Sequence, residues 1–379
     1  MPVTPYSTKA VRPRTRRLQN GLFTVLWIFC WFYPHMGLLA QQPDPPARKS
    51  IYADGRPFAW KRIPCHDEGI VLKYGNGPDS CDVYGAREAN VNHVGDLYYL
   101  FYDGAGSDGW KSCLAVSRDL RTWTKRGAIL ALGAAGANDS KSASSPWVIE
   151  AADGWHMFYL GTPHTSPPPY RIPSFPYLTM KAHAKSIEGP WVKDYALTPF
   201  FTKPGTYYSA TAAPGFIVKK DDEYLQFFSP SIIDSAGRTK RTLGIARTKD
   251  LNTPWTVDPT PVVPLEEQVE NTSLYFEKTS GYWLLFTNHI GLDKTGEEYT
   301  DAIWVYWSKD LNKWDAANKA VVLDSLNCSW AKGAIGMPSV IRVGDKLALL
   351  YDAPGGTSIN HMHRNIGLAW LSLPVKIPD

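Results

Sequence analysis

A short, strongly apolar strand pattern recurs five times along this chain. The copies lie at residues 98–102, 155–159, 224–228, 282–286 and 347–351. Four of them are followed by a polar turn that ends in Trp, as in Ser117-Arg118-Asp119-Leu120-Arg121-Thr122-Trp123. A repeat of about 60 residues, built from short strands and turns, is typical of a radial β architecture.

Each repeat divides into as many as four strands. In the first repeat we expect strands at 90–94, 97–102, 111–117 and 123–132, and the inner strands of the others at 147–151, 215–219, 273–278 and 339–343. Tight turns such as Gly95-Asp96 and Gly344-Asp345 predict hairpins between the first two strands.

The last repeat lacks a fourth strand, because its third strand, at 365–373, brings the chain to its end. The segment 69–74, before the first repeat, has the pattern of the missing strand. An unpaired sheet edge is unfavourable, so we expect 69–74 to pair beside 367–371. The sequence therefore predicts an all-β, five-bladed β-propeller with four-stranded antiparallel blades, closed by an N-terminal strand.

The N-terminal segment has the pattern of an export signal. Arg12, Arg14, Arg16 and Arg17 precede an uncharged run at 22–40, and its apolar core of about eleven residues is short for a membrane span. We expect a signal peptide at 1–40, cleaved after Ala40, with a retained membrane anchor as the alternative. A Pro-rich linker at 41–60 and one domain at 61–379 follow. The expected location is secreted or periplasmic, with membrane contact only if the segment is retained.

Composition narrows the classes of partner. The net charge of +4 comes without a basic stripe, so nucleic acid is not an expected partner. The 15 Trp and 20 Tyr residues favour strands and also surfaces that stack on sugars. After the signal segment, four cysteines remain, which is enough for one or two disulfides in an exported protein: Cys65, Cys81, Cys113 and Cys328. Their spacing does not indicate zinc, and we expect no metal and no cofactor.

Propeller topology predicts the place of a functional site. Loops before the inner strands and loops after the second strands meet on one face, around the axis, and loops on a rigid scaffold commonly carry function. The former are 75–89, 133–146, 203–214, 265–272 and 324–338, and the latter are 103–110, 162–173, 229–241, 288–300 and 352–364. The catalytic and binding residues are therefore expected in these loops.

With these features the sequence resembles the five-bladed propeller glycoside hydrolases, such as the arabinanases and xylosidases of family 43, the invertases of family 32 and the anhydro-galactosidases of family 117. The resemblance covers residues 65–379 and rests on strands such as Tyr98-Tyr99-Leu100-Phe101-Tyr102 and on ends of the form Ser-x-Asp-Leu-x-x-Trp. It implies cleavage of glycosidic bonds, in which a carboxylic acid protonates the leaving oxygen and a carboxylate activates water or attacks carbon.

The family pattern also implies catalytic residues. Family 43 opens its first inner strand with Asp-Pro, where this chain has Glu88 followed by Ala89. The general acid of that family begins a motif like Glu-Gly-Pro-x-Leu-Tyr-Lys. Here Glu270-Asn271-Thr272-Ser273-Leu274-Tyr275 has that shape, in the fourth predicted blade rather than the third. The family's third acid has no clean counterpart: Ser145 stands at its place, and Asp139 lies upstream. The candidate catalytic residues are Glu88, Glu270 and Asp139, with Glu270 as the general acid.

Other polar residues of the same loops are candidate substrate contacts: Arg87, Lys141, Tyr208, Asn271, His289 and Arg364. His289 follows the strand at 282–286, so either it or Asn288 should face the pocket. The cluster His361-Met362-His363-Arg364 is suited to grip a carboxylate or sulfate on a sugar, and equally suits a solvated loop.

The sequence therefore predicts an exported glycoside hydrolase that acts on an oligosaccharide or polysaccharide. Exo action is expected because long loops, such as 162–173 and 288–300, tend to wall a cleft into a pocket. Two alternatives stay open. Lys141, Lys332 and Arg364 would suit the phosphate of a glycoside phosphorylase, and the imperfect acidic triad leaves a non-catalytic glycan-binding propeller. An approach of Glu88 and Glu270 to within about 5–10 Å across the axial pocket would favour the enzyme. Carboxylates that point apart or lie buried in ion pairs would favour the binding protein.

Overall fold

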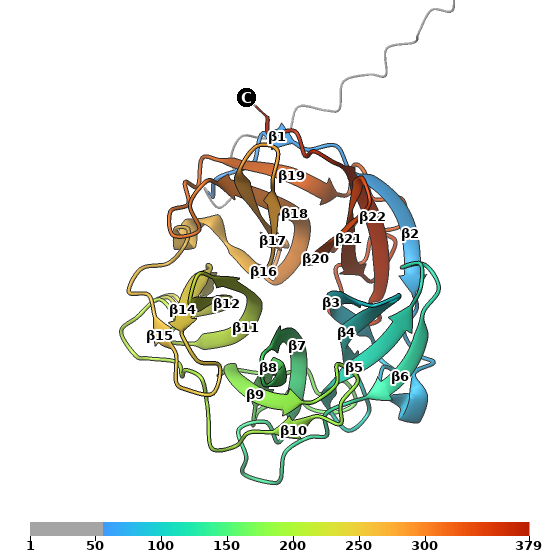
Figure 1. Cartoon of the computed structure of the whole chain (residues 1–379), viewed down its shortest axis with the longest axis vertical. Helices are drawn as coiled ribbons and strands as arrows, with labels where there is room; N and C mark the ends of the chain where they lie inside the picture. The colour runs from blue at the N-terminus through green and yellow to red at the C-terminus, as the bar shows by residue number, and fades with distance from the viewer. Residues whose placement is uncertain (1–55, 379) are drawn as a thin grey trace, which may run out of the picture. The chain divides into compact units, whose positions relative to one another are not determined.

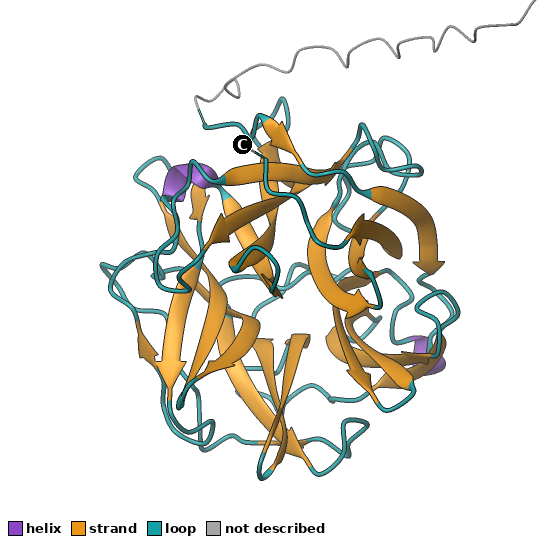
Figure 2. Ribbon diagram, turned by 45° about the horizontal axis from the view of Figure 1, so that its top comes forward, coloured by secondary structure: helices purple, strands orange, loops and turns teal. Residues whose placement is uncertain are grey.

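The computed structural model describes residues 56–378, which belong to the second of the two units of the chain, 1–48 and 49–379. The predicted signal segment lies outside the described residues. The described part is all-β, with two short 3-10 helices at Pro78–Ser80 and Leu265–Glu267 (Figure 2). Within residues 56–378, no helix has the length and apolar character that a membrane span requires.

The strands of the first two predicted blades pair antiparallel in chain order. The first set is β3 (Ala86–Val94), β4 (Leu97–Ala105), β5 (Trp110–Ser117) and β6 (Thr124–Ala128). The second is β7 (Ser142–Ala151), β8 (Gly154–Thr162), β9 (Leu178–Ala184) and β10 (Val192–Lys193). A short parallel pairing between β5 and β7 joins the two sets into one sheet.

The next two sets have the same order with one added strand each. The third is β11 (Thr211–Lys220), β12 (Glu223–Ile233), β14 (Gly244–Thr248) and β15 (Thr256–Val257), with the short β13 (Thr239–Arg241) beside β12. The fourth is β16 (Val269–Glu277), β17 (Tyr282–Leu292), β18 (Glu298–Ser308) and β19 (Lys319–Asp324), with β1 (Lys61–Arg62) parallel to β19.

The last set combines both ends of the domain. It contains β20 (Gly336–Val343), β21 (Lys346–Ala353) and β22 (Asn365–Ser372), and β2 (His66–Leu72) lies antiparallel beside β22. Gly69 is opposite Leu368, and Ile70 is opposite Gly367. This is the pairing expected for the segment 69–74, with the strand itself placed at 66–72.

The first strands of the sets surround a common centre. In Figure 1, β3, β7, β11, β16 and β20 lie nearest to it, and the later strands of each set lie farther out. Contacts run from β3 to β7, β11, β16, β20 and back to β3. Residues that end the inner strands at this centre therefore approach one another from distant parts of the sequence.

The repeated strand motif supplies the hydrophobic core. Phe101, Phe158, Phe227, Phe286 and Tyr351, one from each copy, have no exposed surface. They belong to clusters that fill the space between neighbouring sets, as where Phe158 of β8 and Phe228 of β12 share one cluster. Burial of such a side chain contributes about 1.5–3 kcal/mol. The repetition in the sequence thus reflects one packing solution used around the centre.

The Trp-ended turns also have a common local structure. The Trp123 indole N–H donates to the carbonyl of Leu120 at 2.9 Å, and Trp314 donates to Leu311 in the same way at 2.8 Å. In each turn a Ser hydroxyl accepts backbone N–H groups of the following residues: Ser117 from Asp119, and Ser308 from Asp310. The motif therefore closes the turn by its own side chains.

Two expectations are modified at this level. Two residues expected in the linker are buried against the domain: Ala59 lies in a core cluster, and Arg56 donates to the carbonyl of Ile290. All four cysteines of residues 56–378 are free thiols, so the disulfides allowed by their number are not formed, although Cys81 and Cys113 are in hydrogen-bond contact.

Candidate active site

A bulge near the central end of each inner strand builds the site. The strand register shifts after Arg87 in β3, Ser144 in β7, Ala213 in β11, Glu270 in β16 and Gly336 in β20. The next residues are Glu88, Ser145, Pro214, Asn271 and Met337. All but Pro214 have positive φ angles, from 48° to 59°. Because a bulge re-aims the side chain, these positions turn toward the centre.

All five bulge residues line one pocket, which encloses about 620 Å³ when the space at its mouth is counted. Its remaining lining residues are Arg87, Asp103, Trp110, Ser144, Leu160, Pro173, Tyr177, Thr211, Ala213, Ser229, Arg241, Glu270 and His361. A concave site with a few convergent polar groups is the usual form of a small-molecule site. The sequence prediction that Glu88 and Glu270 reach one pocket therefore agrees with the structure.

Glu88 is held in a setting that favours its protonated form. Its side chain is 17% exposed, its carboxyl accepts a hydrogen bond from the Ser145 hydroxyl, and its backbone N–H donates to Asp352 at 2.8 Å. Desolvation raises the pKa of Glu88, and the negative charges of Asp352 and Glu270 raise it further against the opposing effect of Arg87. A carboxyl group with a raised pKa keeps its proton to a higher pH than an ordinary Glu, as a general acid requires.

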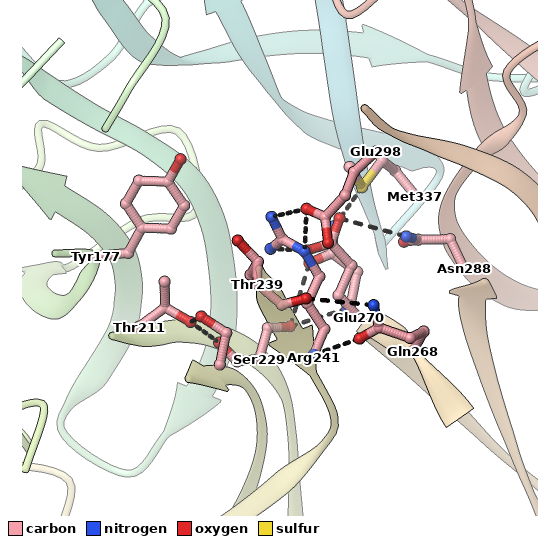
Figure 3. A network of polar contacts seen from close by, with 12 residues as sticks. Tyr177, Thr211, Ser229, Thr239, Arg241, Gln268, Glu270, Asn288, Glu298 and Met337 are labelled. Atoms are coloured by element: carbon pink, nitrogen blue, oxygen red, sulfur yellow. Dashed lines mark hydrogen bonds and ion pairs between the residues drawn. The ribbon is translucent and has the colours of Figure 1, made fainter. Parts of the chain in front are cut away.

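Glu270 has the opposite surroundings. One of its oxygens accepts from the Arg241 Nη1 at 2.6 Å, and the other is 3.4 Å from the Asn288 amide nitrogen (Figure 3). Arg241 is fixed in turn by Glu298, at 2.8 and 3.0 Å, and its backbone N–H donates to the Gln268 side chain at 2.7 Å. A carboxylate paired with a guanidinium carries the negative charge that a base or nucleophile requires.

Asp103 adds a third carboxyl group to the pocket. It lies opposite Arg87 in the register of β3 and β4, is 1% exposed, and accepts the backbone N–H of Ser145. Burial, and then the charge of Glu88, raise the pKa of Asp103 well above its usual range. Ser145 therefore joins two carboxyl groups, Glu88 through its hydroxyl and Asp103 through its backbone.

Four of the predicted site residues line the pocket: Glu88, Glu270, Arg87 and Asn271. Asp139 does not, and its assignment as a catalytic candidate is corrected. It forms an ion pair with Lys193 at 2.5 Å and accepts from the Tyr159 hydroxyl at 2.9 Å. The same arrangement occurs in the first set, where Asp82 binds Tyr102 and Lys125. Asp139 is thus part of a repeated structural contact.

His289 is also placed differently from the prediction. Its side chain has no exposed surface, its Nδ1 is 2.7 Å from an oxygen of Asp301, and its ring stacks on Trp304 at 4.0 Å. Alternation along β17 instead directs the neighbouring Asn288 to Glu270. The second option of the sequence prediction, Asn288, is therefore the one near the site.

Three further candidates lie outside the pocket lining. Lys141 is exposed, and Tyr208 belongs to a core cluster with Phe228. Arg364, 1% exposed, binds Asp352 and the Thr300 hydroxyl, the latter at 3.0 Å. Arg364 thereby fixes the carboxylate that accepts the Glu88 backbone N–H. The solvated-loop interpretation of the cluster 361–364 does not hold for Met362 and Arg364, which are both buried.

Sequence reasoning missed several pocket residues. In the sequence, Asp103 belongs to an Asp-Gly pair of the kind found in many turns, and Arg241 stands in a polar stretch without a recognisable motif. Trp110 and Tyr177 form part of the wall, and burial raises the pKa of Tyr177 to about 12, so its hydroxyl stays protonated. Only the predicted topology pointed to these residues, because all four lie on or next to the loops that follow the second strands of the repeats.

The sequence matches no protein-family model and no curated protein sequence. Solved structures do match. A complex of BT0996 with RGII has a TM-score of 0.61 at 16% identity, over 84% of this protein and 96% of that one. The protein has the fold of glycoside hydrolases. The catalytic domain of the Coprinopsis cinerea GH62 α-L-arabinofuranosidase has a TM-score of 0.57 at 13% identity, over 82% of this protein and 97% of that one.

A third structure is the Cellvibrio cellulosa α-L-arabinanase in complex with arabinohexaose, with a TM-score of 0.53 at 13% identity, over 74% of this protein and 90% of that one. The resemblance to propeller glycoside hydrolases expected from the repeat is therefore confirmed at the level of the fold. The all-β architecture is shared with these enzymes over nearly their whole length.

Proposed function

We propose that the protein is a glycoside hydrolase that cleaves oligosaccharides in the axial pocket of a five-bladed β-propeller. The blade number is supported by the cycle of contacts among β3, β7, β11, β16 and β20. The pairing of β2 with β22 supplies the fourth strand of the last blade and supports closure of the ring. The five bulge positions line one pocket.

The observation that carries the proposal is the contrast between Glu88 and Glu270 in this pocket. Glu88 is desolvated and has a raised pKa, whereas Glu270 is ion-paired with Arg241. Glycoside hydrolysis requires such a pair, one carboxyl protonated and one ionised. We assign Glu88 as the general acid and Glu270 as the base or nucleophile, which reverses the role expected for Glu270 from the family motif.

In this assignment the sugar enters with the bond to be cleaved between the two side chains. Glu88 donates its proton to the leaving oxygen, and the Glu270 carboxylate attacks the anomeric carbon or activates the water that does so. Arg241 and Asn288 hold the Glu270 oxygens in place. Ser145 orients the Glu88 carboxyl, and Asp352 fixes the backbone at Glu88.

The surroundings of the pocket support a carbohydrate substrate and exo action. Pro173 and Tyr177, from the segment that follows β8, stand in its wall beside Trp110, and aromatic rings pack well on the apolar faces of sugars. Structures with the same fold are complexes with RGII, cellotriose and arabinohexaose. The segment 288–300 contributes less to this wall than expected, because it is mostly the extended hairpin of β17 and β18.

The phosphorylase alternative loses its support, because none of Lys141, Lys332 and Arg364 lines the pocket. Lys332 donates to the carbonyls of Ser325 and Cys328 instead. We further propose export of the protein, on the pattern of four Arg residues followed by an apolar run at 22–40. Signal cleavage and secretion are measurable by N-terminal sequencing of the protein recovered outside the cytoplasm.

The experiment that tests the function is a substrate screen of the purified protein. The panel contains 4-nitrophenyl glycosides of the common pentoses, hexoses and uronic acids, together with arabinohexaose, cellotriose and algal oligosaccharides. We expect release of a terminal monosaccharide from at least one oligosaccharide, slowed by about 10²–10⁴-fold in Glu88→Gln. Binding of an oligosaccharide without any turnover would contradict the proposal and support the non-catalytic glycan-binding propeller.

A further inference from the structure

Arg87, beside the proposed acid, is an under-coordinated buried cation. Its side chain is 1% exposed and lies over the Trp110 ring, 4.9 Å from the guanidinium carbon to the ring centre. Its Nη2 is 3.8 Å from a Glu88 oxygen, beyond hydrogen-bond distance. Its Nε and Nη2 have no hydrogen-bond partner within residues 56–378. Such a group would ordinarily turn to the nearest carboxylate and bind it directly.

The contact that prevents this is made by His361. Arg87 Nη1 lies 2.6 Å from His361 Nε2, and the His361 ring stacks on Trp110 with an interplanar angle of 21°. A guanidinium has no acceptor atom, so Nε2 must accept the hydrogen bond and the ring proton must reside on Nδ1. The ring is therefore neutral while the contact exists.

Nearby positive charges and desolvation keep His361 in that neutral form. The residue is exposed at the pocket, yet desolvation of the ring and the positive charges of Arg87, Arg364 and Arg241 lower the pKa of His361 well below its usual range. Protonation would place two donors face to face at 2.6 Å. His361 thus serves as a hydrogen-bond acceptor for Arg87.

We propose that His361 is a positioning residue that holds the Arg87 guanidinium near Glu88 but out of hydrogen-bonding contact with it, so that Glu88 retains its proton. The proposal rests on the proposed role of Glu88 as general acid. A direct Arg–carboxylate hydrogen bond would favour the ionised form and lower the pKa of the acid by about one to three units. His361 and Arg87 therefore set the pH at which the acid is lost.

Other groups also face Glu88 and must be constant in the test. They are Asp103 on β4, Ser145 on β7, Tyr177 before β9, Glu270 on β16, Asp352 on β21 and Arg364 directly before β22. None of them contacts the His361 ring in a hydrogen bond that the structure shows within residues 56–378. A change at His361 consequently reaches Glu88 through Arg87.

The test is the pH dependence of kcat/KM on the best oligosaccharide of the panel above. In His361→Ala, Arg87 is free to bind Glu88, and this contact stabilises the ionised acid. We therefore expect the basic limb of the profile, where kcat/KM falls as Glu88 loses its proton, to move down by about one pH unit. His361→Gln should restore the wild-type limb, because its amide oxygen lies near the place of Nε2. His363→Asn is the matched control: His363 has φ of 60°, which Asn tolerates, and lies outside the pocket lining.

A second variant separates this role from a merely structural one. Arg87→Met removes the cation, so the basic limb should move up. The double variant with His361→Ala should match Arg87→Met, because His361 has nothing left to position.

An unchanged basic limb in His361→Ala, with Glu88→Gln impaired, would overturn the positioning role and leave the function intact. A shift in the double variant equal to that of His361→Ala would overturn the role as well. Full turnover of the oligosaccharide by Glu88→Gln would instead refute the acid assignment itself, and the inference about His361 with it.

Discussion

The hydroxyl of Ser145 on β7 donates a hydrogen bond to the carboxyl group of Glu88 on β3. Ser145 stands at the bulge where the family pattern led us to expect an acid, so this chain has a neutral donor at that point of the pocket. The additional carboxyl group comes from β4 instead, as Asp103, which accepts the Ser145 backbone N–H. The acidic cluster is therefore built differently from the pattern that the sequence suggested.

The hydrogen bond from Ser145 has a measurable consequence. It favours the ionised form of Glu88 and partly offsets the desolvation that raises the pKa. In Ser145→Ala the pKa of Glu88 should rise further, and the basic limb of kcat/KM should move up by about half a pH unit. Ser142→Ala, which removes a hydroxyl from the same strand outside the pocket lining, is the control. A downward shift in Ser145→Ala would contradict this role of the hydroxyl.

Asp103 should make stability depend on pH. Its pKa in the folded protein is raised, so the stabilisation from its neutral form is complete at low pH and is lost as the pH rises through that folded-state pKa. Asp103→Asn keeps the oxygen that accepts from Ser145 but does not ionise. We expect its melting temperature to exceed that of the wild type at pH 8 by a few degrees, with the gap closing toward pH 4. A variant less stable than wild type at pH 8 would refute this.

Asp139 should matter for stability and not for turnover. It has no exposed surface and neutralises Lys193, whose side chain is 11% exposed. Loss of one partner of a buried pair costs about 3–5 kcal/mol, so Asp139→Asn should lower the denaturation midpoint while the folded fraction keeps its kcat and KM. A large loss of kcat at an unchanged midpoint would return Asp139 to the catalytic site.

The sequence pattern predicts the inner strands but places the start of each one too late. Their predicted starts were residues 90, 147, 215, 273 and 339, and the structure begins each strand three to five residues earlier. Four of these residues are the first paired after the bulge, and Gly215 directly precedes the fifth. A bulge interrupts the alternation of side chains between the two faces, so a pattern with a period of two ends there.

The same interruption decides which site residues could be found. Glu88 and Glu270 were accessible to prediction because they stand in sequence next to recognisable strands. Asp103 and Arg241 reach the pocket only through strand register and through contacts between sets, which the sequence alone does not specify. His289 and Asn288 differ by one residue, and a slip of one residue exchanges the two faces of a strand.

The most direct test compares Glu88→Gln and Glu270→Gln on two substrates of one sugar, a natural oligosaccharide and a 4-nitrophenyl glycoside. A good leaving group needs little protonation, whereas both substrates need the second carboxylate. We expect Glu88→Gln to lose about 10²–10⁴-fold in rate on the oligosaccharide and far less on the nitrophenyl glycoside. Glu270→Gln should be impaired on both. The reverse pattern, or wild-type turnover of the oligosaccharide by either variant, would contradict the assignment.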